Sequence, residues 1–373
     1  MIKYYLIIQY ILRDFFKKII FFEISFLKPP PKKILVFDKK SINHAKALFP
    51  KSSLTFFNTR IQGLNIYVVI VTLLKLGFKN FSMNYKKIYF NLVNPEIVYT
   101  AIDNSLSFYR LKNESFSNAI YISDQNGMRN NSFYQEAKKY RDNNKNLSLK
   151  CDIFFVLGNN EKKKLQNIIN SNFYAFGSTK NNFYLNNKRK KIIKNLVFFS
   201  NLPIVKFAKD IILFKNAIKF SKKYNYKLFF IDRLQKNYLP FLKEHFNLDD
   251  FTYVSPKSSS ETYSFFTDDN FSIFNHSSLG YEFIARGLKG ISFGHNSKYI
   301  LHEKNRKKYP NEGIFWTKKI DYKNFEKKIL TIIKYNPIKW KSGTFKYSKE
   351  LMCYDKSNVN KKKIINNFKI KNK

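Results

Sequence analysis

The segment richest in side chains that can do chemistry is NHSSLGYEFIARGLKGISFG, residues 275–294. Small and polar residues separate a predicted strand from a helix expected to begin near Leu279, and they are His276, Ser277, Ser278 and Gly280. A helix N-terminus attracts anions through its free N–H groups and its dipole, and small side chains let phosphate oxygens approach the backbone. The spacing therefore predicts a phosphate-binding turn.

Glu282 in the same segment would repel a phosphate. A carboxylate can, however, accept hydrogen bonds from the two hydroxyls of a ribose, so the turn and Glu282 together indicate a nucleoside diphosphate. A local alternative stays open, in which Ser277 and Ser278 cap the helix and Glu282 pairs with Arg286 four residues later. His276 can donate to phosphate when protonated, or it can serve only as a structural hydrogen-bonding group.

Other polar residues follow predicted strands in the second half of the chain, and they are Ser200, Arg233 and Ser255. We expect them to border the same donor pocket. Arg233 can hold a diphosphate through two parallel hydrogen bonds and stabilise the charge of a leaving group. The alternative is a solvated surface arginine, which is common in so basic a chain.

Two aspartates follow predicted strands in the first half, Asp103 after PEIVYTAI and Asp124 after NAIYIS. Either carboxylate can act as a general base that takes a proton from an attacking hydroxyl, and His44 is the next candidate. We prefer Asp124 because a polar loop follows it, in which amides can bind sugar hydroxyls and glycine permits a positive φ. The loop residues are Gln125, Asn126, Gly127 and Arg129. An aspartate bonding its own turn is the alternative.

Short apolar runs with polar ends alternate with helical patterns along the chain, which is typical of α/β domains with parallel sheets. The predicted strands lie in residues 32–38, 95–103, 118–123, 151–158 and 172–177, and then in 195–200, 226–232, 251–255, 270–275 and 290–294. We therefore predict two tandem Rossmann-like doubly wound domains, with ligands at the carboxyl ends of the strands. The predicted divisions are 1–31, an amphipathic helix and Pro-rich linker; 32–190, an acceptor domain; 191–345, a donor domain; and 346–373, a C-terminal segment and basic tail that frays from Asn358.

The N-terminal 26 residues are apolar but are interrupted by Arg13, Asp14, Lys17 and Lys18, so no uncharged stretch reaches the roughly 20 residues that span a bilayer. Apolar residues at helical spacing predict an amphipathic helix, which either lies on an anionic membrane surface or packs on its own domain. The uncharged stretch 64–74 predicts a buried helix. A small-residue cleavage site is missing before the three prolines at 29–31.

The chain of 373 residues has 68 Lys and Arg against 26 Asp and Glu, a net charge of +42. Such a charge usually indicates nucleic acid or anionic membranes. Here it accompanies 40 Phe, 25 Tyr and only 11 Gly, a pattern typical of AT-rich codon usage, and the lysines are dispersed. We therefore expect no nucleic-acid partner. Neither the two cysteines nor the five histidines have metal-ligand spacing, and no P-loop or dinucleotide motif occurs, so we expect no metal, no cofactor and a reducing cytoplasm.

Five stretches, in residues 95–111, 122–130, 151–159, 176–182 and 277–294, resemble in the same order the family of surface carbohydrate biosynthesis proteins. The resemblance extends over roughly 33–315 and implies a two-domain GT-B fold. It also implies a metal-independent glycosyltransferase that moves a sugar from a nucleotide-sugar donor to a surface glycan or lipid-linked acceptor at the inner face of the cytoplasmic membrane. In that family an acidic residue often precedes the first serine of the last stretch, where this chain has His276.

Two other classes remain open at this point. A polyol-phosphate transferase of surface polymer synthesis would share the fold, because fold does not fix function. Such enzymes usually have paired histidines around a phosphate, which this sequence lacks. A basic nucleic-acid-binding protein is supported by charge alone.

Overall fold

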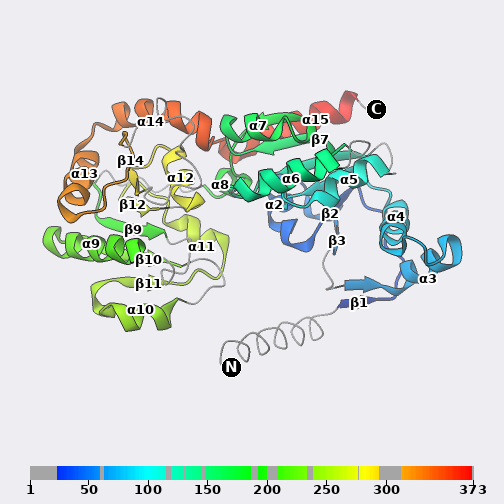
Figure 1. Cartoon of the computed structure of the whole chain (residues 1–373), viewed down its shortest axis with the longest axis horizontal. Helices are drawn as coiled ribbons and strands as arrows, with labels where there is room; N and C mark the ends of the chain where they lie inside the picture. Colours follow the sequence, from blue (N-terminus) through cyan, green and yellow to red (C-terminus); the bar gives the residue numbers. More distant parts are fainter. Residues whose placement is uncertain are drawn as a thin grey trace.

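The computed structural model describes residues 23–58, 63–114, 119–129, 131–143, 148–185, 192–199, 208–232, 238–275, 277–293 and 312–371. Two six-stranded parallel sheets, each flanked by helices, form the two halves of the molecule (Figure 1). The predicted α/β fold with two Rossmann-like sheets is confirmed. The predicted amphipathic helix at the N-terminus lies outside the described residues.

The first sheet has the strand order β3-β2-β5-β6-β7-β8, and all its pairs are parallel. Its strands are β2 (Ile34–Phe37), β3 (Leu54–Phe57), β5 (Ile97–Thr100), β6 (Ile120–Asp124), β7 (Lys150–Val156) and β8 (Asn170–Ala175). The helices of this half are α2 (Ile42–Leu48), α4 (Phe81–Val93), α5 (Leu106–Glu114), α6 (Asn131–Asn143), α7 (Asn159–Leu165) and α8 (Thr179–Phe183), with short 3-10 turns η1 (Lys39–Ser41) and η2 (Lys51–Ser53).

Both faces of this sheet are covered. Alternate residues of β2 belong to different apolar clusters, since Leu35 and Phe37 pack in one and Ile34 and Val36 in the other. Successive side chains of a strand point to opposite faces, so the continuous apolar run ILVF is what a doubly covered parallel strand requires.

The second sheet has the order β11-β10-β9-β12-β13-β14, again parallel. Its strands are β9 (Asn195–Phe199), β10 (Lys227–Ile231), β11 (Thr252–Val254), β12 (Asn270–Phe274), β13 (Gly290–Phe293) and β14 (Trp316–Thr317). The helices are α9 (Ala208–Tyr224), α10 (Leu239–His245), α11 (Ser259–Ser264), α12 (Ser278–Ala285), α13 (Tyr322–Lys334) and α14 (Pro337–Leu351), with a 3-10 turn η4 (Leu248–Asp250).

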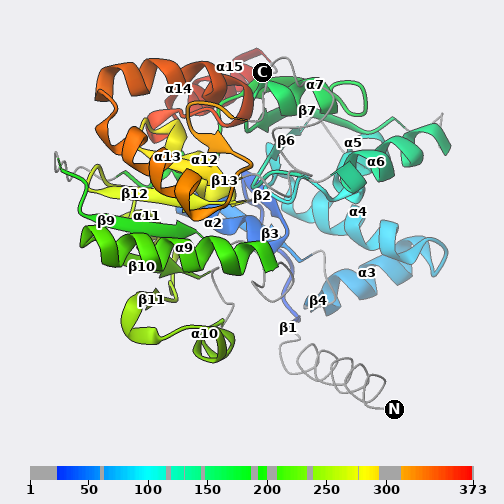
Figure 2. The same cartoon turned by 60° about the vertical axis from the view of Figure 1, so that its left-hand side comes forward.

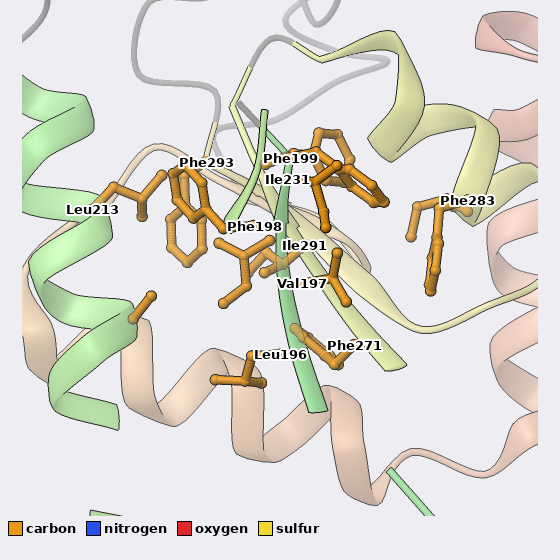
Figure 3. Packing of buried hydrophobic residues seen from close by; sticks show 14 of the residues in the cluster. Leu196, Val197, Phe198, Phe199, Leu213, Ile231, Phe271, Phe283, Ile291 and Phe293 are labelled. Carbon is orange, nitrogen blue, oxygen red and sulfur yellow. The ribbon is translucent and has the colours of Figure 1, made fainter. Parts of the chain in front are cut away.

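The core of the second half is dominated by large side chains. Side chains of β9, β10, β12 and β13 pack together with Leu213 of α9 and Phe283 of α12 (Figure 3). Phe198 lies 5.0 Å from Phe214 between ring centroids, in an edge-to-face arrangement that aromatic pairs favour. The abundance of phenylalanine in the sequence is thus used for core packing.

The chain returns to the first half after α14, which contradicts the predicted frayed tail. A 3-10 turn, η6 (Lys356–Asn358), leads into helix α15 (Val359–Lys371), and Ile365 of that helix lies in the same apolar cluster as Ile34 and Val36. The crossing is tight at Gly177, whose φ is 77° and where an added Cβ would lie 1.9 Å from the Cys353 carbonyl oxygen. The C-terminal segment is therefore a structural part of the first domain.

A buried ion pair fixes this return. The ammonium of Lys361 donates to Asp124 Oδ1 at 2.8 Å, to the Gly177 carbonyl at 2.8 Å and to Thr179 Oγ1 at 2.6 Å. Tyr99 donates to the other carboxylate oxygen, Asp124 Oδ2, at 2.7 Å. Both charged side chains are fully buried. All three ammonium hydrogens have acceptors, which a buried charge needs.

Helix α3 (Ile66–Leu76) differs from its prediction. It follows a small parallel pair of strands, β1 (Glu23–Ser25) and β4 (Gly63–Asn65), and it packs on α4. The stretch is helical, but only Val68 and Thr72 of α3 are buried, so the prediction of a buried helix is wrong. No single helix of the described residues is long and apolar enough to span a bilayer; α3 and α4 meet these criteria only as a pair, bent by 112°.

We predict that Lys361→Met lowers the free energy of unfolding by about 3 to 5 kcal/mol, because it leaves the Asp124 carboxylate buried without its cation. Urea denaturation followed by circular dichroism measures the change. The matched control is Lys362→Met, since Lys362 is exposed; a change within about 0.5 kcal/mol is expected there. The double variant Lys361→Met, Asp124→Asn should recover a large part of the loss. A single variant as stable as the wild type would contradict the ion pair's importance.

Candidate functional site

The predicted phosphate turn lies between β12 and α12, in the middle of the second sheet. Ser277 is the N-cap residue, and its side chain makes no capping hydrogen bond, so the capping alternative is wrong for this serine. The helix begins at Ser278. The N–H groups of Ser278 and Leu279 have no hydrogen-bond partner among the described residues. An anion bound at a helix N-terminus accepts hydrogen bonds from N–H groups in these positions.

Gly280 has a packing role in the structure. An added Cβ at this position would lie 2.0 Å from the ring of Phe274, the last residue of β12. The glycine therefore lets α12 approach its own sheet closely, as glycines do where a helix packs on a strand. This packing contact is enough to explain why a glycine occupies position 280, and no bound phosphate is needed for the explanation.

Glu282 lies in the second turn of α12 and is buried, with 3% of its surface exposed. The hydroxyl of Tyr263 donates to Glu282 Oε2 at 2.6 Å, and the hydroxyl of Ser178 from the first half is a second partner. Burial raises the pKa of Glu282, while the hydrogen bonds from Tyr263 and Ser178 oppose the rise. A carboxyl group that ordinarily prefers water is thus enclosed where the two halves meet.

Arg286 does not form the predicted helical ion pair with Glu282. Its Nε donates to Asn181 Oδ1 at 2.7 Å, and its Nη2 donates to the Tyr184 carbonyl at 2.6 Å. Asn181 and Tyr184 belong to the segment of α8 in the first half. The guanidinium also lies over aromatic rings, 4.8 Å from the centroid of Phe266 and 5.5 Å from those of Tyr263 and Tyr354. Arg286 therefore joins the two halves instead of stabilising its own helix.

Two further titratable groups lie near this junction. Lys180 of α8 is half-buried, and burial lowers its pKa while the charge of Glu282 opposes that shift. His44 of α2 is buried, and its Nδ1 has no hydrogen-bond partner among the described residues. Burial, with the charges of Lys180 and Lys361, holds the pKa of His44 well below its ordinary value of 6.5. His44 is therefore neutral in the folded protein.

Asp103 follows β5 and is fully buried. The guanidinium of Arg129 binds both carboxylate oxygens of Asp103, with Nε to Oδ2 at 2.8 Å. Burial raises the pKa of Asp103, and the charge and hydrogen bonds of Arg129 act against the rise. The predicted acceptor loop is thus tied to the first predicted base by a two-pronged ion pair.

Asp124, the preferred base, has its carboxylate enclosed by Lys361, Tyr99 and Thr179. A general base must reach the proton that it removes, and this carboxylate is fully buried with its oxygens already bonded. Asp103 is equally buried and bonded, but its partner Arg129 is 18% exposed, whereas Lys361 is fully buried with Asp124. The ion pair gives Asp124 a structural role, and Asp103 is the predicted base whose partner can be displaced.

The polar loop after Asp124 divides into two parts. Gln125 is buried. Its side-chain oxygen accepts a hydrogen bond from the Leu157 N–H at 3.0 Å, and its side-chain N–H donates to Glu161 at 2.8 Å, so both ends of the amide are bonded within the domain. Asn126 is exposed and accepts from Arg129. The φ of Gly127 is not in the left-handed region, which makes the predicted turn conformation wrong. Asn126 and Arg129 are the loop side chains that remain accessible.

The structure brings only some of the predicted residues together. Ser200, Arg233 and His276 lie outside the described residues. Ser255 is exposed beyond β11, at the edge of the sheet, and its hydroxyl bonds Tyr253. Three strand spacings separate β11 from β12, roughly 14 Å, so Ser255 is not next to the Ser277 turn. A cavity of about 230 Å³ lies elsewhere, lined by residues of β3, β4 and α4.

Sequence reasoning missed Lys361, Tyr263 and Asn181, which bind Asp124, Glu282 and Arg286. The sequence did contain a signal for helix α15, since Ile364, Ile365 and Phe368 have helical spacing in the segment predicted to fray. The partners themselves have no local signal because they lie far apart along the chain.

Comparisons with known proteins agree with this architecture. Residues 207–369 match the model of a family described as "putative O-antigen biosynthesis protein". No curated protein sequence is significantly similar to the chain. With its two tandem parallel sheets and the similarity to the solved structures described next, the chain has a GT-B-like fold. The predicted resemblance to surface carbohydrate biosynthesis proteins of this fold is thereby confirmed.

The likeness to solved structures extends over nearly the whole chain. The UDP-bound MnaA of S. aureus has a TM-score of 0.52 at 12% identity, covering 91% of this chain and 96% of that one. The wall teichoic acid polymerase TagF, as its H548A variant, has a TM-score of 0.54 at 10% identity, with coverages of 92% and 89%. The UDP-GlcNAc 2-epimerase of Neisseria meningitidis, bound to UDP-GlcNAc, has a TM-score of 0.50 at 10% identity, with coverages of 91% and 99%.

We predict that the neutral state of His44 makes the protein less stable in mild acid. The unfolded chain binds a proton at His44 below pH of about 6.5 and the folded chain does not, so stability is lost as pH falls. The loss between pH 7.5 and pH 5.5 is about 1.4 kcal/mol. Urea denaturation at pH 7.5 and 5.5 should show this difference in the wild type and in His245→Gln, but not in His44→Gln. The same pH dependence in all three chains would contradict the assignment.

Proposed function

We propose that the protein is a glycosyltransferase that moves a sugar from a nucleotide-activated donor to a surface glycan or lipid-linked acceptor in cell-surface polysaccharide biosynthesis. The observation that carries the proposal is the turn at Ser277: uncapped N–H groups begin α12 at the carboxyl edge of the second sheet, and Glu282 follows one turn later. Ligands of open parallel sheets bind at this edge. The similarity of residues 207–369 to an O-antigen biosynthesis family supports the same conclusion.

In this proposal the phosphates of the donor accept hydrogen bonds from the N–H groups of Ser278 and Leu279, and Glu282 accepts from the ribose. Glu282 now accepts from Tyr263 and Ser178, so donor binding requires an exchange of partners. Lys180 is a cation whose charge acts on this carboxylate, and it can balance phosphate charge. Ser200, Arg233 and His276 stay predicted members of the donor site.

Asp103 is the proposed general base for the acceptor hydroxyl. Its raised pKa suits proton uptake, and Arg129 can release one of its two bonds to the carboxylate when an acceptor binds. Asn126 and Arg129 are the accessible groups of the loop and can bind acceptor hydroxyls. Metal independence and a place at the inner face of the cytoplasmic membrane stay predictions.

Product analysis distinguishes the proposed transfer from the other chemistries of this fold. Incubation of the full chain with UDP-GlcNAc and a lipid-linked glycan acceptor should yield an acceptor one sugar longer together with free UDP. Conversion of the UDP-sugar without acceptor would indicate an epimerase. Transfer of a polyol phosphate from a CDP-activated donor would indicate a polymerase of the second class considered above.

We predict that Glu282→Gln weakens binding of the nucleoside diphosphate about 10- to 150-fold, since a hydrogen bond to a charged group contributes roughly 1.5 to 3 kcal/mol. The amide keeps an acceptor for the Tyr263 hydroxyl, so the melting temperature should change by only a few degrees.

Isothermal titration calorimetry with UDP measures the affinity, and Glu244→Gln is the control because the Glu244 side chain is 72% exposed. An unchanged dissociation constant in the Glu282 variant would remove the turn as the donor site.

A further inference from the structure

The first domain carries an exposed apolar surface that the proposed function does not use. We define it as the apolar hairpin: α3, the connection 77–80 and the start of α4. Its exposed large side chains are Ile70 (52%), Leu74 (81%), Leu76 (44%) and Phe78 (82%). Isolated exposed apolar residues are ordinary, whereas four within nine residues form a patch that indicates an interaction surface.

The hairpin projects away from the junction of the two halves. Figures 1 and 2 show α3 at the end of the first domain opposite the second sheet. The segment that follows β1 extends this surface. Strand β1 pairs with β4 just before α3, and the next residues, Phe26 and Leu27, are 69% and 81% exposed. The Leu27 carbonyl accepts from the Asn65 side chain at 2.8 Å, which holds Leu27 beside the start of α3.

The shape of the hairpin suits lying on a bilayer more than crossing one. The two helices have 11 and 13 residues, which at a rise of 1.5 Å per residue makes each roughly 17 to 20 Å long, against a hydrocarbon core of roughly 30 Å. They are bent by 112°, and Gly77, with a φ of 66°, ends α3 at the bend. The exposed apolar residues are concentrated at this bend.

The positive charge of the hairpin indicates an anionic partner. Lys75 and Lys79 are exposed beside Leu74 and Phe78. Moreover, the sequence from residue 39 to residue 95 contains no Asp or Glu. Apolar side chains flanked by cations complement an anionic lipid surface, in which rings and alkyl groups enter the interface and ammonium groups meet phosphates. A second copy of this chain would bring like charge to like charge, given the net charge of +42.

We propose that the apolar hairpin docks the protein on an anionic membrane, with Leu74, Leu76 and Phe78 in the interface and Lys75 and Lys79 against lipid phosphates. The inference stands apart from the donor site and deepens the proposed function in one respect: it brings the acceptor domain to the surface where a lipid-linked acceptor would lie.

The test is co-sedimentation of the full chain with vesicles of phosphatidylcholine and phosphatidylglycerol in a 3:1 ratio. The variant Leu74→Ser, Phe78→Ser should bind at least about tenfold more weakly, because two exposed apolar side chains no longer enter the interface. The matched control is Ile338→Ser, Phe345→Ser on α14, whose side chains are 79% and 59% exposed and are also flanked by lysines. It should bind like the wild type.

A second variant tests the charge. Lys75→Gln, Lys79→Gln should weaken binding to these vesicles by about fivefold per lysine and leave binding to pure phosphatidylcholine unchanged. Melting temperatures of all variants should match the wild type, since every substituted side chain is exposed.

Several outcomes would overturn the proposal. Equal binding of the Leu74, Phe78 variant and its control would do so, as would loss of binding in the α14 variant alone. Binding that persists in the hairpin variant but disappears on deletion of residues 1–22 would assign docking to the N-terminal segment. Loss of a dimer in sedimentation velocity, with vesicle binding unchanged, would assign the surface to a second copy. UDP titration of the same variants separates these results from failure of the proposed function, because donor affinity should not change.

Discussion

The buried ion pair between Lys361 and Asp124 is the constraint on which the arrangement of the two halves depends. It holds α15 against the first sheet, and α15 can reach that place only if α14 and the crossing segment run from the second half back to the first. Asp355 and Asn358 reinforce the crossing, since the Asp355 N–H donates to Asn182 and the Asn358 amide donates to the Thr179 carbonyl. The chain therefore passes between the halves twice, and α8 is bonded to the second passage and to Arg286 of the second half.

The second connection, through Arg286 and Glu282, lies beside the proposed donor turn. Arg286 binds Asn181 and Tyr184, and Glu282 is bonded by Tyr263 and Ser178, so a ligand that takes over the Glu282 carboxylate also removes a contact between the halves. In the proposed function, donor binding and the relative position of the two halves would therefore be linked through one carboxyl group. Such linkage is how two-domain enzymes couple occupancy to closure.

Most strands of the two sheets could be predicted from the sequence, because central strands such as β2, β5 and β12 are short apolar runs buried on both faces. Strand β3, which is only partly buried, was not predicted. The short strands β1, β4 and β14 escaped prediction because two or three residues carry no period. The roles of polar residues were harder to predict: Asp124 and Gln125 have the right types at the right sheet edge, yet Lys361 and Glu161 occupy them.

Two errors have the same physical origin. The tail was predicted to fray because its lysines and asparagines outnumber its apolar residues. Its three apolar residues at helical spacing are nevertheless enough to hold a helix against a face of the first sheet. The stretch at 64–74 was predicted to be buried because it is uncharged, but no element of the described chain covers its outer side. The sequence of a segment shows which of its side chains are apolar enough to be buried. It does not show whether another part of the fold provides a surface to bury them against.

The distance along the chain between the members of the ion pair has a consequence for the order of folding. Asp124 and Lys361 are separated by 237 positions, so the first domain is synthesised long before the residue that neutralises its buried carboxylate. Until α15 is made, the face of the first sheet that carries Ile34 and Val36 lacks Ile365, and the Asp124 carboxylate lacks its cation. Although its sheet comes first in the sequence, the first domain is completed only after the second sheet has been made.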